Sequence, residues 1–121
     1  VWNRTGAKAD AFAGAHKARR AKSPADAAKD AGAVITCLGD DPDIAMVLGE
    51  VLPVVSKGAL IIDHSTASPD LARRLSADFS EKGASFIDAP VSGGEAGAKA
   101  GKLSIMCGGE AAAVERARSV L

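Results

Sequence analysis

The chain is short of aromatic residues and has no excess of either charge, and both shortages argue against whole classes of function. It contains one Trp, three Phe and no Tyr, which are too few for a platform that stacks nucleic-acid bases. Lys and Arg together number 15, as do Asp and Glu, so no net field attracts nucleic acid or an anionic membrane. We therefore expect neither a nucleic-acid partner nor a membrane partner.

Cysteines and long apolar stretches are also scarce. The only two cysteines, Cys37 and Cys107, are far apart and lack the spacing of a metal site. They do not form a disulfide framework, and this favours a reduced, cytoplasmic setting. No run approaches the roughly 18 consecutive apolar residues that a membrane span needs.

Small and aliphatic residues are abundant and fall into short apolar runs that alternate with helical stretches. Apolar residues make up 47% of the 121 positions, enough for the core of a single domain. Val1 and Trp2 suggest the end of one strand, and the runs at 33–38 and 58–63 predict strands buried on both faces. Further strands are expected at 84–91 and 102–107.

Helix signals separate these runs. Ser23 and Ser68, each followed by Pro, are typical N-cap residues, and Gly49 and Pro53 are expected to interrupt the helix that begins near Pro42. Helices are expected at 8–13 (ended by Gly14), 24–31, 42–55, 69–82 and 110–121. This alternation predicts an α/β fold with a parallel sheet.

In such sheets ligands bind beyond the carboxyl ends of the strands, where four polar or glycine-rich loops are expected. The loops are residues 3–5, 38–43, 63–69 and 88–94. Arg4 in the first loop suits a ribose 2′-phosphate, although a surface Arg at a strand end is the alternative. The helix start in the second loop could favour an anion, but taken alone it is better explained as a plain capped helix.

The third and fourth loops each admit two interpretations. His64 could act as an acid or base, but a structural role is favoured because the adjacent Asp63 should point to the opposite face of the strand. The fourth loop does not fit G-x-x-x-x-G-K-[ST] or G-x-G-x-x-G. Ser92, Gly93 and Gly94 could form a nest for a small anion such as a carboxylate, or a tight turn that needs positive φ.

Four segments together resemble the β-hydroxyacid dehydrogenases. They are VWNRT (1–5), VITCLGDD (34–41), IDHSTASP (62–69) and FIDAPVSGGEAGAKAGKLSIMCGG (86–109). This family includes 3-hydroxyisobutyrate dehydrogenase, tartronate semialdehyde reductase and the glyoxylate/succinic semialdehyde reductases, with an NAD-binding domain like that of 6-phosphogluconate dehydrogenase. The resemblance implies a Rossmann-like domain and NAD(P)-dependent hydride transfer between a small β-hydroxyacid and its semialdehyde.

The resemblance also implies roles for particular residues. Ser92, Gly93 and Gly94 would hold the carboxylate of a small substrate. Asn3, Arg4 and Thr5 would bind the adenosine ribose, with Arg4 favouring NADP(H) over NAD(H). Thr66 would contact the nicotinamide side of the cofactor, and Leu38 and Gly39 would line it. The implied cofactor residues are Asn3, Arg4, Thr5, Leu38, Gly39 and Thr66.

The chain departs from the family pattern in two ways. Many members have Leu-Pro in place of Leu38-Gly39 and Ser, Met or Thr in place of His64, which leaves the substrate open. The family's first strand with its G-x-G-x-x-G turn would precede Val1, and its all-α domain with the catalytic Lys would follow Leu121. We therefore expect residues 1–121 to be a partial Rossmann-like domain that is inactive alone, in a parent that forms a homo-oligomer through the helical domain.

No residue of the chain is assigned the catalytic role, because Lys99 and Lys102 lack the family context and are expected to face solvent. Two other functions stay open. One is a non-catalytic binding or interaction module that uses an exposed sheet edge. The other is an imine reductase of the same fold, although the Ser-Gly-Gly loop favours carboxylate substrates.

Overall fold

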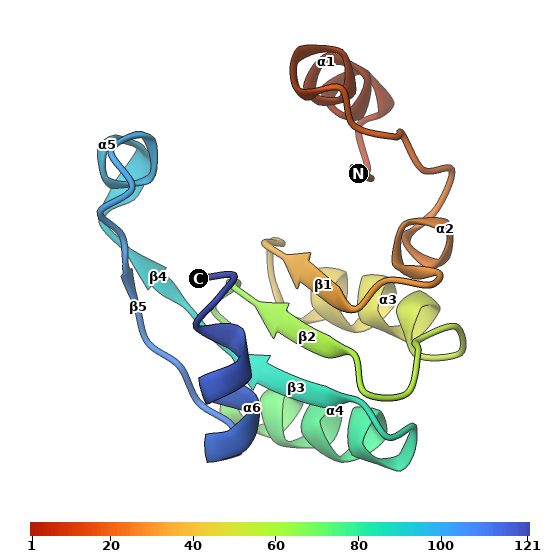
Figure 1. The fold of residues 1–121 in the computed structure, drawn as a ribbon, viewed down its shortest axis with the longest axis vertical. Coiled ribbons are helices and arrows are strands. Elements are labelled where there is room, and N and C mark those ends of the chain that lie inside the picture. Colours follow the sequence, from red (N-terminus) through yellow and green to blue (C-terminus); the bar gives the residue numbers. More distant parts are fainter.

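The computed structural model describes residues 1–121 and contains a parallel sheet covered on both faces by helices (Figure 1). The sheet has the order β1-β2-β3. Its strands are β1 (Ala33–Thr36), β2 (Leu60–Asp63) and β3 (Ser85–Asp88). The predicted α/β class with a parallel sheet is confirmed.

The helices that follow the strands divide between the two faces of the sheet. On one face, α3 (Asp41–Val51) and α4 (Pro69–Glu81) pack with Ile61 and Phe86 in the larger core cluster. On the other face, α6 (Ala111–Ala117) packs against alternate residues of the strands in a smaller cluster. All four residues of β2 are buried, so the middle strand anchors both halves of the core.

The carboxyl ends of the three strands lie level with one another. We call this end of the sheet, where the strands stop, its carboxyl edge, as distinct from the edge strand β1. Thr36 is paired in register with Asp63, and Asp63 with Asp88. The loops after the strands therefore emerge at the same edge, as expected from the parallel order. The short hairpin of β4 (Val91–Ser92) and β5 (Ser104–Ile105), with α5 (Gly94–Lys99) at its tip, projects beyond this edge (Figure 1).

The predicted helix caps form. The side chains of three N-cap residues accept hydrogen bonds from backbone N–H groups in the first turns of α2 (Pro24–Ala28), α3 and α4. The pairs are Ser23 with Asp26, Asp40 with Asp43, and Ser68 with Leu71. These bonds satisfy N–H groups that have no partner within the helix, so the loops before the helices are fixed at their ends.

Gly14 and Gly49 were predicted to end or interrupt helices, and neither does. Helix α1 (Gly6–His16) runs through Gly14 and ends at Lys17, which adopts a left-handed conformation with φ 51°. Helix α3 likewise continues unbroken through Gly49 to Val51. Glycine lowers helix propensity by only about 1 kcal/mol, and in α3 the packing of Ile44, Val47, Leu48 and Val51 outweighs this cost. Helix α2 ends at Ala28, before Gly32.

The strand predictions hold for the centre of the sheet and fail at its margins. Val1 and Trp2 form no strand, although the Val1 carbonyl accepts a hydrogen bond from the Ala21 N–H at 2.8 Å. Strand β1 is not buried on both faces, because it is an edge strand and Ile35 is 53% exposed. The run at 102–107 contributes only β5, which pairs antiparallel with β4 outside the main sheet. None of the helices combines the length and the hydropathy that a membrane-spanning helix requires.

Candidate cofactor site at the carboxyl edge of the sheet

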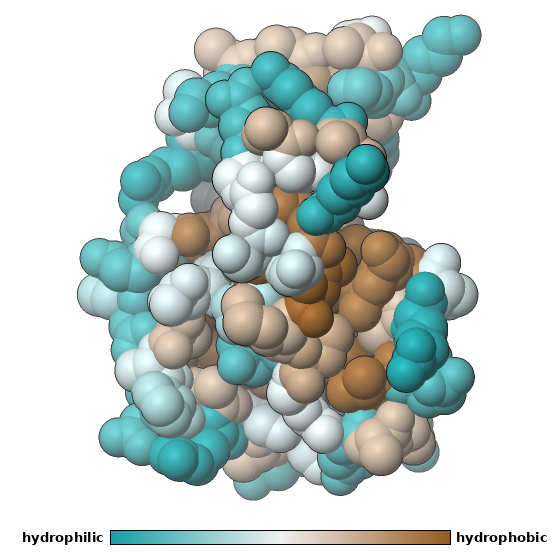
Figure 2. Space-filling model, turned by 90° about the vertical axis from the view of Figure 1, so that its left-hand side faces the viewer, coloured by the Kyte–Doolittle hydropathy of each residue, from teal (hydrophilic) through white to brown (hydrophobic).

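A cleft of about 850 Å³ separates the N-terminal segment and α1 from β1 and α3. Its lining includes five residues that were predicted to bind a cofactor, namely Asn3, Arg4, Thr5, Leu38 and Gly39. Much of the rest of the lining is apolar, and hydrophobic side chains are exposed at mid-height on the face of the molecule in Figure 2. The cleft runs along the whole of β1, so its volume includes the space beside this open edge strand of the sheet.

Arg4 lies at the mouth of this cleft and forms an ion pair there. Its Nη1 donates to Oδ1 of Asp43 at 2.7 Å, and the side chains are 71% and 25% exposed. Asn3 Oδ1 accepts from the Thr5 N–H and so fixes the turn that leads into α1. Exposed ion pairs contribute about 1 kcal/mol or less, so Arg4 can exchange Asp43 for another anion at small cost.

Gly39 lies directly against the Asp43 carboxylate. A Cβ on Gly39 would lie 2.6 Å from Oδ2 of Asp43, so a side chain there would displace the end of the Asp43 side chain. Glycine leaves room for this carboxylate beside the loop after β1 while it pairs with Arg4. Sequence reasoning missed Asp43 as a site residue, because its only visible signal was a helix start.

A second missed residue is Asp63, which lies fully buried at the end of β2. Its Oδ1 accepts from the Thr36 hydroxyl at 2.8 Å, the Ser65 hydroxyl at 2.6 Å and the Ser65 N–H at 3.1 Å. Its Oδ2 has no hydrogen-bond partner. The available signal was an acidic residue that directly follows an apolar run, since a buried carboxyl needs several donors.

The structural role favoured for His64 agrees with its contacts. Its Nδ1 lies 2.7 Å from the carbonyl oxygen of Ala89, in the loop after β3. No hydrogen bond joins His64 to Asp63, whose carboxyl contacts Thr36 and Ser65 instead. The imidazole therefore links two loops at the edge of the sheet.

Asp88 ends β3 beside Asp63 and exchanges two backbone hydrogen bonds with Gly108. Burial, and then the charge of Asp63, raise the pKa of the Asp88 carboxyl above its ordinary value. Asp41, at the start of α3, differs, because hydrogen bonds from the Ser68 side chain and then from its N–H lower the pKa of the Asp41 carboxyl.

The Ser-Gly-Gly loop combines the two interpretations that the sequence left open. Gly93 has φ 133° and Gly94 has φ 61°, so the turn does need positive φ at both. The N–H groups of these glycines donate no turn, loop or cap hydrogen bond, and Ser92 is exposed. A turn that requires glycine therefore also presents free donors.

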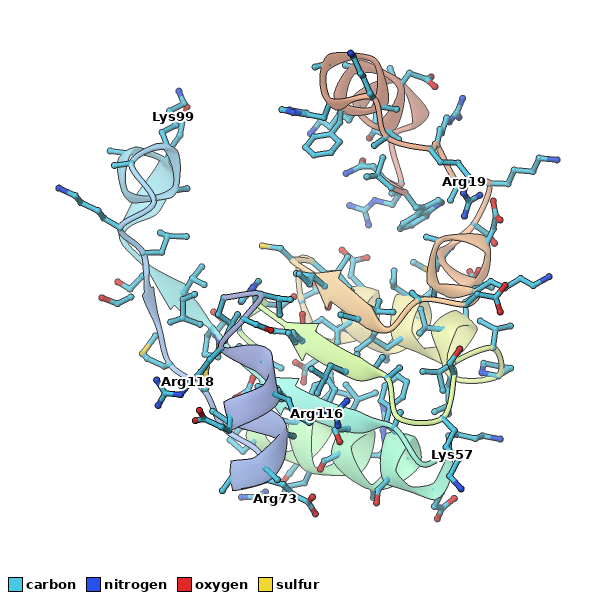
Figure 3. The ribbon with its side chains drawn as sticks, viewed as in Figure 1. Arg19, Lys57, Arg73, Lys99, Arg116 and Arg118 are labelled. Carbon is cyan, nitrogen blue, oxygen red and sulfur yellow. The ribbon has the colours of Figure 1, made fainter.

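The structure brings the predicted residues to one edge of the sheet but not into one pocket. Thr66 follows β2, and Ser92, Gly93 and Gly94 follow β3, yet none of these four lines the cleft. Lys99 points outward from α5, where it pairs with Glu95 (Figure 3). Lys57 precedes β2 and so lies at the opposite end of the sheet (Figure 3).

Comparison with known proteins assigns the family. Residues 1–121 match the family model of the NAD binding domain of 6-phosphogluconate dehydrogenase. The chain belongs to this family. As a member, it is 41% identical over 88% of its length to an NAD-dependent L-serine dehydrogenase of Pseudomonas aeruginosa.

Solved structures agree with this assignment. The structure of the 3-hydroxyisobutyrate dehydrogenase of Mycobacterium tuberculosis, with L-serine, superposes with a TM-score of 0.92 over 99% of the chain at 35% identity. An imine reductase of Streptomyces aurantiacus superposes with a TM-score of 0.84 over 98% of the chain at 27% identity. The chain spans 36% of the Pseudomonas protein and 41% of each of the two structures. The relatives are thus oxidoreductases that are longer than this chain.

The raised pKa of Asp88 predicts a pH-dependent effect of Asp88→Asn. A raised folded pKa means that the stability from this group is complete below its unfolded pKa and is lost as the pH rises through the folded value. Asn imitates the protonated carboxyl. We expect Asp88→Asn to increase the free energy of unfolding near pH 7 by less than about 1 kcal/mol, because solvent screens the pair, and to change nothing near pH 3. Urea unfolding at both pH values measures this, with the exposed Asp70→Asn as control, and an equal effect at both would contradict it.

Gly93→Ala and Gly14→Ala should change stability in opposite directions. At Gly93, φ 133° and the Leu103 side chain 3.1 Å from the added methyl group both oppose Ala, so we expect a loss of about 1 to 3 kcal/mol. At Gly14, inside α1, a methyl group meets nothing, and we expect a gain of about 0.5 to 1 kcal/mol. Thermal unfolding compares the two variants, and a stable Gly93→Ala protein would be inconsistent with the required turn.

Proposed function

We propose that the protein containing this chain is an NADP(H)-dependent oxidoreductase that interconverts a small β-hydroxyacid and its semialdehyde, of the 3-hydroxyisobutyrate or tartronate semialdehyde type. In this proposal residues 1–121 are a partial cofactor-binding domain. The observation that carries it is the cleft lined by residues 3–5 and by Leu38 and Gly39 in a chain of the NAD-binding family. We also propose that the protein is cytoplasmic and homo-oligomeric.

In this proposal the cleft holds the adenosine part of a phosphorylated dinucleotide. The Arg4 guanidinium is exposed and can form two parallel hydrogen bonds with a 2′-phosphate, while Asn3 and Thr5 offer neutral donors beside it. Thr66 would contact the nicotinamide side, and Leu38 and Gly39 would line the cofactor between the Arg4 end of the cleft and Thr66. When bound, the cofactor supplies or accepts the hydride.

The remaining roles are binding of the substrate and donation of a proton. Ser92, Gly93 and Gly94 would hold the substrate carboxylate with a hydroxyl and two backbone N–H groups. Reduction also needs a proton for the developing alkoxide, and we assign that step to a Lys beyond Leu121. Neither Lys99 nor Lys102 takes this role, because Lys99 points away on α5 and both are exposed.

Assays of the natural protein test the activity. We expect it to oxidise NADPH with a small semialdehyde acid, and residues 1–121 alone to show no turnover. NADPH absorbance measures the rate with each acid and, in parallel, with a cyclic imine. Preference for the imine would favour an imine reductase, the function of one structural relative.

A non-catalytic module is the other candidate, and the exposed edge of β1 with Ile35 favours it. Size-exclusion chromatography and NADPH titration of residues 1–121 address it. A stable monomer, together with a natural protein that does not bind NADPH, would replace the oxidoreductase proposal with this one.

The Arg4–Asp43 pair predicts how cofactor preference changes. Arg4→Ala should weaken NADPH binding about tenfold or more and NADH binding much less, because only NADPH carries the 2′-phosphate. Asp43→Asn should instead tighten NADPH binding severalfold, since Arg4 then loses a competing anion and the phosphate a like charge.

Calorimetric titration of both cofactors tests these variants. Arg73→Ala is the matched control, because Arg73 is equally exposed and pairs with Asp70 at 2.7 Å on α4. If Arg4→Ala weakened NADH and NADPH alike, Arg4 would have no part in the preference for NADP(H).

A further inference from the structure

We infer that Asp63 and Ser65 are positioning residues that fix the distance between the two loops at the nicotinamide end of the cofactor site. This inference rests on the proposed function, because those loops carry Leu38, Gly39 and Thr66. Asp63 and Ser65 need not touch the cofactor, since neither lines the cleft and both are buried. They act through the backbone of the loop after β1.

A chain of hydrogen bonds runs from β2 to that loop. The Ser65 hydroxyl donates to Asp63 Oδ1 at 2.6 Å and accepts from the Leu38 N–H at 2.8 Å. Asp63 Oδ1 also accepts from the Ser65 N–H at 3.1 Å, so one oxygen holds both the backbone and the hydroxyl of Ser65. The hydroxyl proton is thereby committed to Asp63, and the oxygen lone pairs face Leu38.

The base of this chain is rigid. Asp63 is fully buried in the middle strand, and its Oδ1 accepts a third bond from the Thr36 hydroxyl on β1. The same carboxyl oxygen thus joins the ends of β1 and β2. Because Ser65 is only 3% exposed, water is not placed to replace a lost bond.

Apart from these hydrogen bonds of Asp63 and Ser65, a second link joins the same two loops. The Ser68 N–H donates to Asp41 Oδ1 at 2.9 Å, close to the start of α3. This link lies toward the helices, whereas the Ser65 bond lies next to Leu38 and Thr66. The loss of the Ser65 hydroxyl should therefore leave the helices in place and free only the segment expected beside the nicotinamide.

Ser65→Ala in the natural protein tests the inference. The variant removes the donor to Asp63 and the acceptor for Leu38 and leaves Thr66 intact. Ser80→Ala is the control, because it removes a serine hydroxyl near the end of α4, outside the lining of the cleft. Two probes are titrated, NADPH and 2′,5′-ADP, which carries the same 2′-phosphate but lacks the nicotinamide half.

We expect Ser65→Ala to weaken NADPH binding about tenfold and to leave 2′,5′-ADP binding within about twofold. Ser80→Ala should change neither affinity. Equal losses for both probes, or an unchanged NADPH affinity, would overturn the positioning role. A wild-type protein that binds neither probe would instead refute the proposed function, so the two failures are distinguishable.

Discussion

The buried Asp63 carboxyl holds together the edge of the sheet on which the proposed site depends. A carboxyl without exposure is costly to bury, and three donors on one oxygen offset that cost. These donors come from the end of β1 and from the loop after β2. A single acceptor thus determines how the chain leaves two neighbouring strands, and the register that places Thr36, Asp63 and Asp88 side by side makes this possible.

Charge is arranged differently in two parts of this edge. The outer end is the Arg4–Asp43 pair beside the cleft, and the inner end is Asp63 and Asp88 at the ends of β2 and β3. At the outer end, Arg4 and Asp43 form an exposed pair that can open for a ligand at little cost. At the inner end, burial and then the charge of Asp63 raise the pKa of Asp88, and no cation is paired with either carboxyl. The outer end therefore suits recognition of an anion, whereas the inner end suits fixed geometry.

Local signals in the sequence were sufficient for the centre of the fold. Apolar runs located β2 and β3, and Ser68 before Pro69 located the start of α4, because caps and buried strands depend on nearby residues. The margins could not be predicted in this way. Ile35 is exposed because β1 lies at the edge of the sheet, and α5 forms within a loop whose glycines do not indicate a helix.

The same distinction applies to the site, where the positions of loops could be predicted but contacts between side chains distant in sequence could not. Asn3, Arg4, Leu38 and Gly39 were predicted to meet because both loops were expected to follow parallel strands, and they do line one cleft although Val1 and Trp2 form no strand. The contact of Asp43 with Arg4 spans 39 positions, and the bond of Ser65 to Leu38 spans 27, so no local pattern reveals either. The roles proposed for Thr66 and for Ser92, Gly93 and Gly94 stay predictions.

Hydrogen–deuterium exchange of the natural protein, with and without NADPH, locates the cofactor on the chain. We expect NADPH to slow exchange in segments 3–6, 37–41 and 64–67, and to leave α6 unchanged. Protection confined to α4 and α6, or no protection at saturating NADPH, would contradict a cofactor site at the carboxyl edge of the sheet.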